Sequence, residues 1–482
     1  MNEQILPLPA LQIPPLPDED AVRRMLDRAR TVPCGKLVVL NDGAAGIQAV
    51  HDVPVYTDWR RETLLRALRE PGHMVFILTD SRCLSHRETQ RIHRELAGNL
   101  AWAARQSGTE FQLLSQGDAA LRGHYPLETE TLRQELEKQL PVRFDGEILM
   151  PYSGESGCYT IRGTHYVRTG DVLVPAGQTE FARDAAFGYR ASDLAEWCGE
   201  MTEGRCAASG VVRITLDELR APDVAGITGK LMDTHDFTRY AVDAADDRDA
   251  EVFAAALLQA IAAGKRYLFR CAAGLVRVLG RVERRAPLTR AELQPGHGPG
   301  LILVGSHTKK TTDQLQHLLQ AQMLLEPICF DVSGAADSAA LTRERDRVLE
   351  QLEKVLAAGH TAVVYTSRRL IPGRGGSPQE DRAISARISQ AIASLAAQLH
   401  ARPGYIIAKG GITSSDVGVR GLGMQRAWVL GQLLPGVSVW RTGEESRFPG
   451  LPYVIFPGYA GEADSLRQAA EILEAGRRAY AQ

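Results

Sequence analysis

Short apolar runs of strand length alternate with helical patterns along most of this chain. The runs include Leu37–Leu40, Val75–Leu78, Phe111–Leu114 and Ile148–Met150, with helical patterns such as Arg87–Arg105 between them. This alternation is typical of parallel sheets, because a crossover connection must lead from one parallel strand to the next. The pattern therefore predicts an α/β protein in which each mostly parallel sheet is flanked by helices.

The length of 482 residues predicts more than one domain, because a single hydrophobic core stops growing at a smaller size. Segment 286–299, which contains prolines, glycines and charges, is predicted to be a linker. We therefore expect two domains, residues 21–285 and 300–482, with a cleft between them. The proline-rich residues 1–20 predict an extended arm that crosses its own domain or a partner subunit, or else is disordered.

Composition restricts the kinds of partner. The chain is 44% hydrophobic and 24% charged with a formal net charge of −2, as in soluble globular proteins. It has no basic run, so we expect no nucleic-acid partner. Its longest apolar stretch, Val252–Ala263, is too short to span a bilayer, so we expect no membrane partner. Seven scattered cysteines and the lack of a secretion leader predict reduced thiols in a cytoplasmic protein.

Three glycine-rich turns in the C-terminal half have the composition of phosphate-binding loops. Each follows an apolar strand and precedes a helical pattern: Gly305–Thr312 after Leu301–Val304, Lys409–Ser415 after Tyr405–Ala408, and Pro457–Gly461 after Tyr453–Phe456. Glycine lets the backbone approach a ligand closely, and N–H groups at a helix start attract anions. The spacing is not that of a P-loop. Because ligands bind at the carboxyl ends of parallel strands, the three turns predict one polyphosphate site.

The predicted phosphate contacts share these turns and are Ser306, Lys310, Lys409, Gly410, Gly411, Thr413, Gly458 and Gly461. Any one of the turns is equally well explained as an ordinary connection from strand to helix. The occurrence of three favours ligand binding. The sequence identifies no metal ligands, and Asp416 would either hold Mg²⁺ through water or cap a helix.

Four segments resemble the four-carbon acid sugar kinase family. They are Leu121–Glu128, Thr179–Gly188, Gly305–Leu315 and Lys409–Ala427, and the last of them is the most specific. The resemblance implies a first domain that binds a sugar acid and a second domain that binds ATP with Mg²⁺. It also implies an ATP-dependent transferase of carbohydrate metabolism that phosphorylates threonate, erythronate or 3-oxo-tetronate. A homo-oligomer is compatible with the sequence.

The chain departs from the family where the acid would bind. The family motif Asp-Asp-Asp-Pro-Thr-Gly is replaced at 41–46 by Asn-Asp-Gly-Ala-Ala-Gly, and Arg-Gly-Asp-Ser-Thr-Leu-Arg-Gly is replaced at 116–123 by Gln-Gly-Asp-Ala-Ala-Leu-Arg-Gly. Each lost charged hydrogen bond would weaken binding by about 1.5–3 kcal/mol. Two explanations remain open. Either the substrate has changed while phosphoryl transfer persists, or transfer is lost and a small-acid-binding or nucleotide-binding regulatory protein remains.

The substrate half contains two candidates for the catalytic base. Asp118 follows the strand Phe111–Leu114 in a glycine-flanked turn and is the first candidate, although it could instead cap the next helix. Asp42 is the second. The predicted substrate-binding residues are Arg82, Gln116, Arg122, Gly123 and His124, with Arg82 and Arg122 as candidates for the carboxylate of the acid.

Overall fold

Parallel strands form the centre of both units into which the chain folds. The computed structural model describes residues 5–7, 13–234, 236–368 and 378–476. The first unit contains the described residues up to Asp42 together with Asp58–Glu283, and the second contains Gly43–Thr57 with the described residues from Arg284 onward. Each unit is described separately below.

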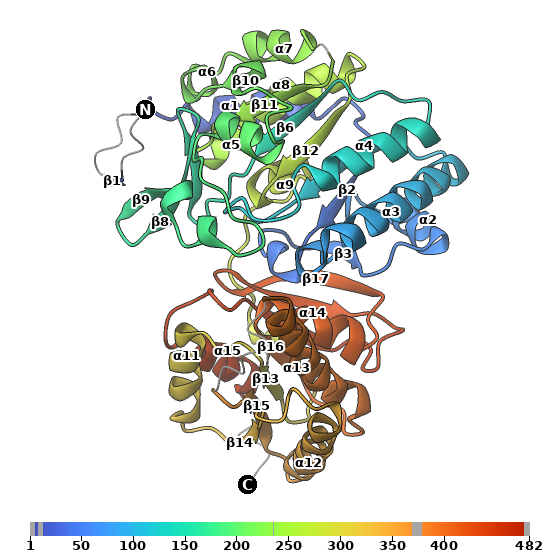
Figure 1. The fold of residues 1–482 in the computed structure, drawn as a ribbon, viewed down its shortest axis with the longest axis vertical. Helices are drawn as coiled ribbons and strands as arrows, with labels where there is room; N and C mark the ends of the chain where they lie inside the picture. Colours follow the sequence, from blue (N-terminus) through green and yellow to red (C-terminus); the bar gives the residue numbers. More distant parts are fainter. Residues whose placement is uncertain (1–4, 8–12, 235, 369–377, 477–482) are drawn as a thin grey trace. The chain divides into compact units, whose positions relative to one another are not determined.

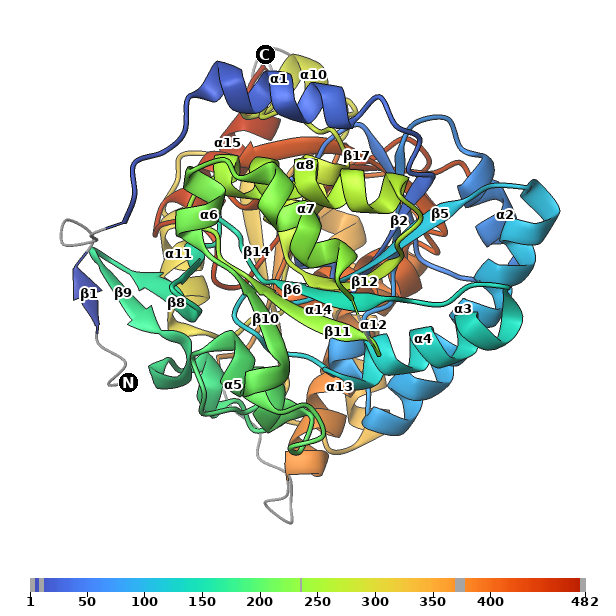
Figure 2. The ribbon, with the colours of Figure 1, turned by 90° about the horizontal axis from the view of Figure 1, so that it is seen from above.

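The sheet of the first unit has the order β10 (Val211–Ile214), β11 (Thr238–Val242), β6 (Gly146–Met150), β12 (Tyr267–Cys271), β5 (Phe111–Gln116), β2 (Lys36–Asn41) and β4 (Met74–Leu78). All neighbours in this order are parallel. Helices α3 (His86–Ser107) and α4 (Leu127–Gln139) cover one face, and α7 (Val224–Met232) and α8 (Asp247–Ala262) cover the other (Figure 2). Other helices of this unit are α2 (Arg61–Arg69), α5 (Leu194–Met201), α6 (Leu216–Arg220) and α9 (Ala273–Leu279).

Strands β2, β4 and β6 are buried along their whole length. A strand that is covered on both faces has no solvent side, so it is read in the sequence as a continuous apolar run rather than an alternating one. Helix α3 has clear boundaries: Ser85 and Glu88 form a capping box at its start, and Gly108 ends it with φ of 67°. The local sequence therefore explains both the continuous apolar runs of these strands and the boundaries of α3.

A small antiparallel sheet is attached to the first unit. Its order is β1 (Leu6–Pro7), β9 (Val172–Pro175), β8 (Thr164–Thr169) and β7 (Cys158–Ile161). The described part of the N-terminal arm lies on this unit, because Leu6 pairs with Leu173 and the carbonyl of Pro14 accepts a hydrogen bond from Arg220. Helix α1 (Glu19–Ala29) begins inside the predicted arm, with Asp18 as its cap.

The sheet of the second unit has the order β3 (Val53–Tyr56), β17 (Arg426–Leu434), β18 (Val437–Thr442), β19 (Pro452–Phe456), β16 (Ile406–Lys409), β13 (Leu301–Val304), β15 (Thr361–Thr366) and β14 (Leu325–Phe330). The strands from β19 to β14 are parallel, whereas β3, β17 and β18 are antiparallel to their neighbours within the unit. Helices α11 (Lys309–Leu319) and α15 (Ser465–Glu474) lie on one face, and α12 (Ser338–Ala357) and α13 (Pro378–Gln398) lie on the other (Figure 1).

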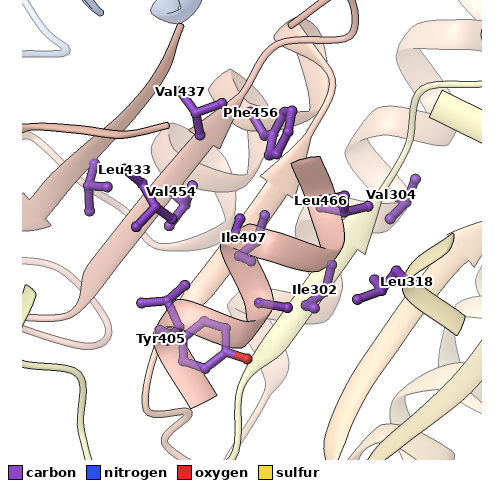
Figure 3. Packing of buried hydrophobic residues seen from close by; sticks show 14 of the residues in the cluster. Ile302, Val304, Leu318, Tyr405, Ile407, Leu433, Val437, Val454, Phe456 and Leu466 are labelled. Carbon is purple, nitrogen blue, oxygen red and sulfur yellow. The ribbon is translucent and has the colours of Figure 1, made fainter. Parts of the chain in front are cut away.

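The core of the second unit lies between its sheet and the helices α11 and α15. Ile302 and Ile407 from the strands pack with Leu318 and Leu466 from the helices, and all are buried (Figure 3). Burial of a side chain of this size stabilises the fold by about 1.5–3 kcal/mol. This packing fixes the strand ends from which the glycine-rich turns emerge.

The unit boundaries differ from the predicted domains in two places. Segment Gly43–Thr57 belongs to the second unit, because β3 pairs antiparallel with β17. The predicted linker 286–299 is packed into the second unit: it contains α10 (Arg290–Leu293), and Leu293 is buried in the core. Proline and glycine near the unit boundary suggested a linker, but the apolar residues among them are part of the core.

The described helices include none that is both long and apolar enough to cross a membrane. In architecture, each unit is the predicted helix-flanked, mostly parallel sheet. The predicted cleft between domains stays a prediction.

Candidate functional site

Polar side chains of the first unit collect at the carboxyl ends of neighbouring strands. Asp42 directly follows β2, Gln116 ends β5, and Arg82 lies in the turn after β4. Leu40 of β2 pairs with Ile77 of β4 and Ser115 of β5, so these strands end together. Ligands bind at this edge in open α/β sheets. The structure thus brings these predicted residues together.

Asp118 is held by two arginines. Its Oδ1 lies 3.3 Å from Arg82 Nη1, and its Oδ2 accepts a hydrogen bond of 2.6 Å from Arg122 Nε. Burial raises the pKa of Asp118, but the charges of Arg82 and Arg122 outweigh that effect and hold the pKa below its ordinary value. Asp118 is therefore an ionised carboxylate with both oxygens engaged, which makes it a weak base.

Asp42 has the opposite environment. It is 5% exposed, Arg82 Nη2 lies 3.9 Å from its Oδ1, and its Oδ2 has no hydrogen-bond partner among the described residues. Burial raises the pKa of Asp42 to about 6, and Arg82 and Arg270 counter only part of this effect. A carboxylate with such a pKa and an unoccupied acceptor oxygen can take a proton near neutral pH. The structure therefore favours Asp42 over Asp118 as the base.

Arg270 of β12 is a member of this site that the sequence reasoning missed. Its Nη1 donates to Glu128 at 2.8 Å and its Nη2 donates to the carbonyl of Arg122 at 3.0 Å. A Cβ on Gly117 would lie 2.2 Å from the guanidinium carbon, and one on Gly123 would lie 2.5 Å from Nη2. Both glycines thus leave room for Arg270. The sequence feature that could have indicated this role is an arginine within the otherwise apolar strand Tyr267–Cys271.

The predicted substrate residue His124 is turned toward the main chain. Its Nε2 lies 3.1 Å from the carbonyl oxygens of both Ser81 and Leu84, and its Nδ1 lies 3.2 Å from His86. His124 therefore anchors the turn that contains Arg82, and its contact with substrate stays a prediction. Burial lowers its pKa, so the neutral ring is favoured.

In the second unit, the three glycine-rich turns lie side by side because β13, β16 and β19 are adjacent parallel strands. They border a cavity of about 520 Å³. Five of the predicted phosphate contacts line it: Ser306, Gly410, Gly411, Thr413 and Gly458. Gly410 has φ of 122°, a conformation that favours glycine. A Cβ on Gly305 would lie 2.1 Å from Thr413 Oγ1, so the first two turns are in close contact.

The other wall of the cavity is apolar and comes from α13. Ile384, Ile388 and Ile392 line it at intervals of four residues, which places them on one face of the helix, and Val332 adds to the wall. A cavity with polar turns at one side and aliphatic side chains at the other can hold a ligand with a charged end and an apolar end. The sequence reasoning did not identify α13 as part of the site.

The two predicted lysines and Gly461 do not line this cavity. Lys409 is fully buried, and its Nζ donates to the carbonyl of Pro457 at 2.7 Å and lies 4.1 Å from the centre of the Phe456 ring. Lys310 donates to the carbonyls of Tyr459 and Gly461. Burial, with the charge of Lys310 as second cause, lowers the pKa of Lys409 to about 7. Both lysines therefore contact the loop after β19 and do not line the cavity, and their contact with phosphate stays a prediction.

Among the described residues, no group of three or more His, Cys, Asp or Glu side chains is arranged to hold a metal ion. Asp416 Oδ1 lies 3.1 Å from Arg420 Nε, so this carboxylate is paired with the π-helical turn that follows it. Mg²⁺ keeps several waters and often binds through substrate phosphates with only one or two carboxylates. The described residues therefore do not form a metal cage of three or more such ligands, and Mg²⁺ stays a prediction.

Comparison with known proteins gives the two units separate assignments. The model of the sugar-binding N-terminal domain matches residues 37–279, and the model of the nucleotide-binding C-terminal domain matches residues 301–466. Together these domains define a protein that binds a sugar and a nucleotide. The chain belongs to the four-carbon acid sugar kinase family. No curated protein sequence matches it.

Two solved structures share the fold. One is from Salmonella typhimurium LT2 and is provisionally described as a tRNA synthase; it is 16% identical, with a TM-score of 0.63 over 90% of this chain and 98% of the other. The second is a Haemophilus influenzae protein of the family DUF1537, 19% identical, with a TM-score of 0.58 over 90% of this chain and 100% of the other. At sequence identities this low, the similarity shows only that the fold is shared.

Proposed function

We propose that this protein is an ATP-dependent kinase that phosphorylates a hydroxyl group of a small sugar acid, with Asp42 as the general base. The hydroxyl oxygen attacks the γ-phosphorus and forms a new P–O bond. The bond between that phosphorus and the β,γ-bridging oxygen breaks, ADP leaves, and the hydroxyl proton passes to Asp42. Mg²⁺ on the phosphates would offset their negative charge.

The main support for this proposal is the environment of Asp42. Its Oδ2 is buried without a hydrogen-bond partner among the described residues, which costs free energy unless a ligand supplies the partner. A substrate hydroxyl is such a donor. The neighbouring Arg82 and Arg122 supply positive charge for an acid group, although Asp118 shares both of them. The two cations and the sugar-binding domain family together support a small sugar acid as the substrate.

The cavity of the second unit supports ATP as the donor. N–H groups at three adjoining turns suit phosphates, and the aliphatic wall on α13 suits a nucleobase. The nucleotide-binding domain matches the same half of the chain.

One observation favours the second candidate function, a non-catalytic binding protein. The family arginine at position 116 is a glutamine here, and both oxygens of Asp118 are engaged by arginines within the protein. A ligand acid would have to compete for these cations. The binding protein would retain nucleotide or acid binding without phosphoryl transfer.

A coupled assay of ADP release over a panel of C4 to C6 sugar acids tests the proposal. Turnover with any of them, absent in Asp42→Asn, supports the kinase. Thermal stabilisation by an acid or by ATP without turnover supports the binding protein. Failure to bind ATP with Mg²⁺ at millimolar concentration would overturn both nucleotide-dependent functions.

A further inference from the structure

Arg368 follows β15 and directs its guanidinium group at main-chain carbonyl groups. Its Nη1 donates to the carbonyl of Ser306 at 2.6 Å, and its Nε donates to that of Thr366 at 3.1 Å. Its Nη2 lies 3.5 Å from the carbonyl oxygen of Val304. Because Val304 ends β13 and Thr366 ends β15, this side chain joins the carboxyl ends of two neighbouring strands. Within the described part of the chain, no carboxylate pairs with Arg368.

The contact with Ser306 determines where the next N–H group is directed. In a planar trans peptide, the carbonyl of one residue and the N–H of the next point in opposite directions. The carbonyl of Ser306 is turned to Arg368, so the N–H of His307 is turned away from Arg368. His307 lines the cavity of the second unit, whereas Arg368 does not. The N–H of His307 donates to no other group among the described residues, so it is available to an anion in the cavity.

The turn after β19 is held in the same way. The fully buried Lys409 donates to the carbonyl of Pro457, and the next residue, Gly458, lines the cavity with an N–H that has no acceptor among the described residues. No carboxylate of the described residues pairs with Lys409 either. The two turns meet at Ser306, because a Cβ on Gly458 would lie 3.3 Å from Ser306 Oγ. Two cationic side chains without acid partners therefore hold two adjoining turns in the same orientation.

We propose that Arg368 is a positioning residue that turns the N–H of His307 toward the phosphates of a bound nucleotide, as Lys409 does for the N–H of Gly458. This inference rests on the proposed nucleotide binding and deepens it. An arginine suits the first turn because its planar fork can hold several carbonyls at once. Its charge is not offset by a carboxylate among the described residues, so the field and the N–H dipoles favour the same anion.

Calorimetric titration of Arg368→Met with ATP and with inorganic tripolyphosphate tests the inference. Methionine is unbranched like arginine but has no donor, so the carbonyl of Ser306 loses its partner. We expect both affinities to fall by the same factor, tenfold or more, because the phosphates lose an oriented N–H group and a nearby charge. Adenosine, which has no phosphate, should bind Arg368→Met as it binds the unaltered protein. Arg368→Lys keeps the charge without the fork and should recover only part of the phosphate affinity.

Arg441 provides a matched control in the same unit. Its half-buried guanidinium also donates to main-chain carbonyls, those of Gly450 and Leu293, and none of these residues lines the cavity. Arg441→Met should therefore leave the affinities for ATP, tripolyphosphate and adenosine within twofold of those of the unaltered protein.

Four results would overturn the inference. They are an equal loss of adenosine and tripolyphosphate affinity in Arg368→Met, phosphate affinities within twofold of the unaltered protein in that variant, full recovery in Arg368→Lys, and a similar loss of phosphate affinity in Arg441→Met. If the unaltered protein binds neither ATP nor tripolyphosphate, the proposed function itself fails.

Discussion

Asp42 is a buried and Asp118 a half-buried aspartate, both near strand ends, yet their surroundings give them different chemistry. Two arginines hold the pKa of Asp118 below its ordinary value, whereas burial with weaker compensation raises that of Asp42 to about 6. The sequence suggested both residues but ranked them in the opposite order. That ranking depends on distances to Arg82 and Arg122, which local sequence does not contain.

Asp42→Asn should abolish most of the kinase activity. A positioned general base contributes about 10²–10⁴ in rate, so kcat should fall by roughly that factor. ATP affinity should stay unchanged, because Asp42 belongs to the first unit and the nucleotide cavity to the second. Initial rates and ATP titrations check both parts. Full activity in this variant would rule out Asp42 as the base.

The pH dependence of kcat/KM should report the ionisation of Asp42. The base must be deprotonated to accept a proton, so kcat/KM should rise as pH increases through about 6. Stability should change in the opposite direction: a raised pKa means that the protonated form favours folding, and this contribution is lost as pH rises through about 6. Rates and urea unfolding between pH 4 and 8 measure both trends, and Asp42→Asn should remove both.

Arg270 shows a limit of sequence reasoning at this scale. Its role depends on Gly117 and Gly123, which lie far from it in the sequence and meet its guanidinium only because β5 and β12 are neighbours. A glycine in a loop predicts a turn or a close approach, but not which group makes the approach. The family motif includes these two glycines, but it does not reveal that they leave room for Arg270.

At the scale of elements, most central strands could be predicted because their apolar runs are continuous. Leu301–Val304 was predicted with the bounds of β13, and the turn after each of β13, β16 and β19 was predicted from glycine. The adjacency of these three strands follows from packing and was only an expectation. The apolar face of α13 was missed, since a stripe of isoleucines on a helix usually means core.

Ile388→Trp tests the assignment of α13 to the nucleobase end of the cavity. An indole at this position would fill space that lies against the apolar wall. We expect ATP affinity to fall by tenfold or more while tripolyphosphate affinity stays within twofold. Titration calorimetry measures both. Gln390→Trp, at an exposed position of the same helix, is the control and should leave both affinities unchanged.

At the scale of the whole chain, the two units are not successive segments. The chain leaves the first unit after Asp42, contributes β3 to the second unit, and returns at Asp58. Sequence reasoning did not predict that β3 joins the second unit, because Val-Pro-Val-Tyr is short and contains a proline. Pairing with β17 is what makes it a strand.

Val55→Asp should therefore destabilise the second unit, although Val55 lies near the N-terminus. Val55 is fully buried in β3 and pairs with Ala427 of β17. An unpaired buried charge should cost about 2–4 kcal/mol of unfolding free energy. Hydrogen exchange should show lost protection in β17 and β18, with β5 and β6 of the first unit unchanged. Loss confined to the first unit would contradict this assignment.

The early position of β3 in the chain also affects how the protein is made. Val53 pairs with Val429, so during synthesis β3 emerges long before the ribosome has made its partner strand. The first unit can complete its own sheet before β17 has been made, and the edge of β3 that pairs with β17 is then open to wrong partners. Translation speed and chaperone access should therefore influence the yield of the second unit more than that of the first.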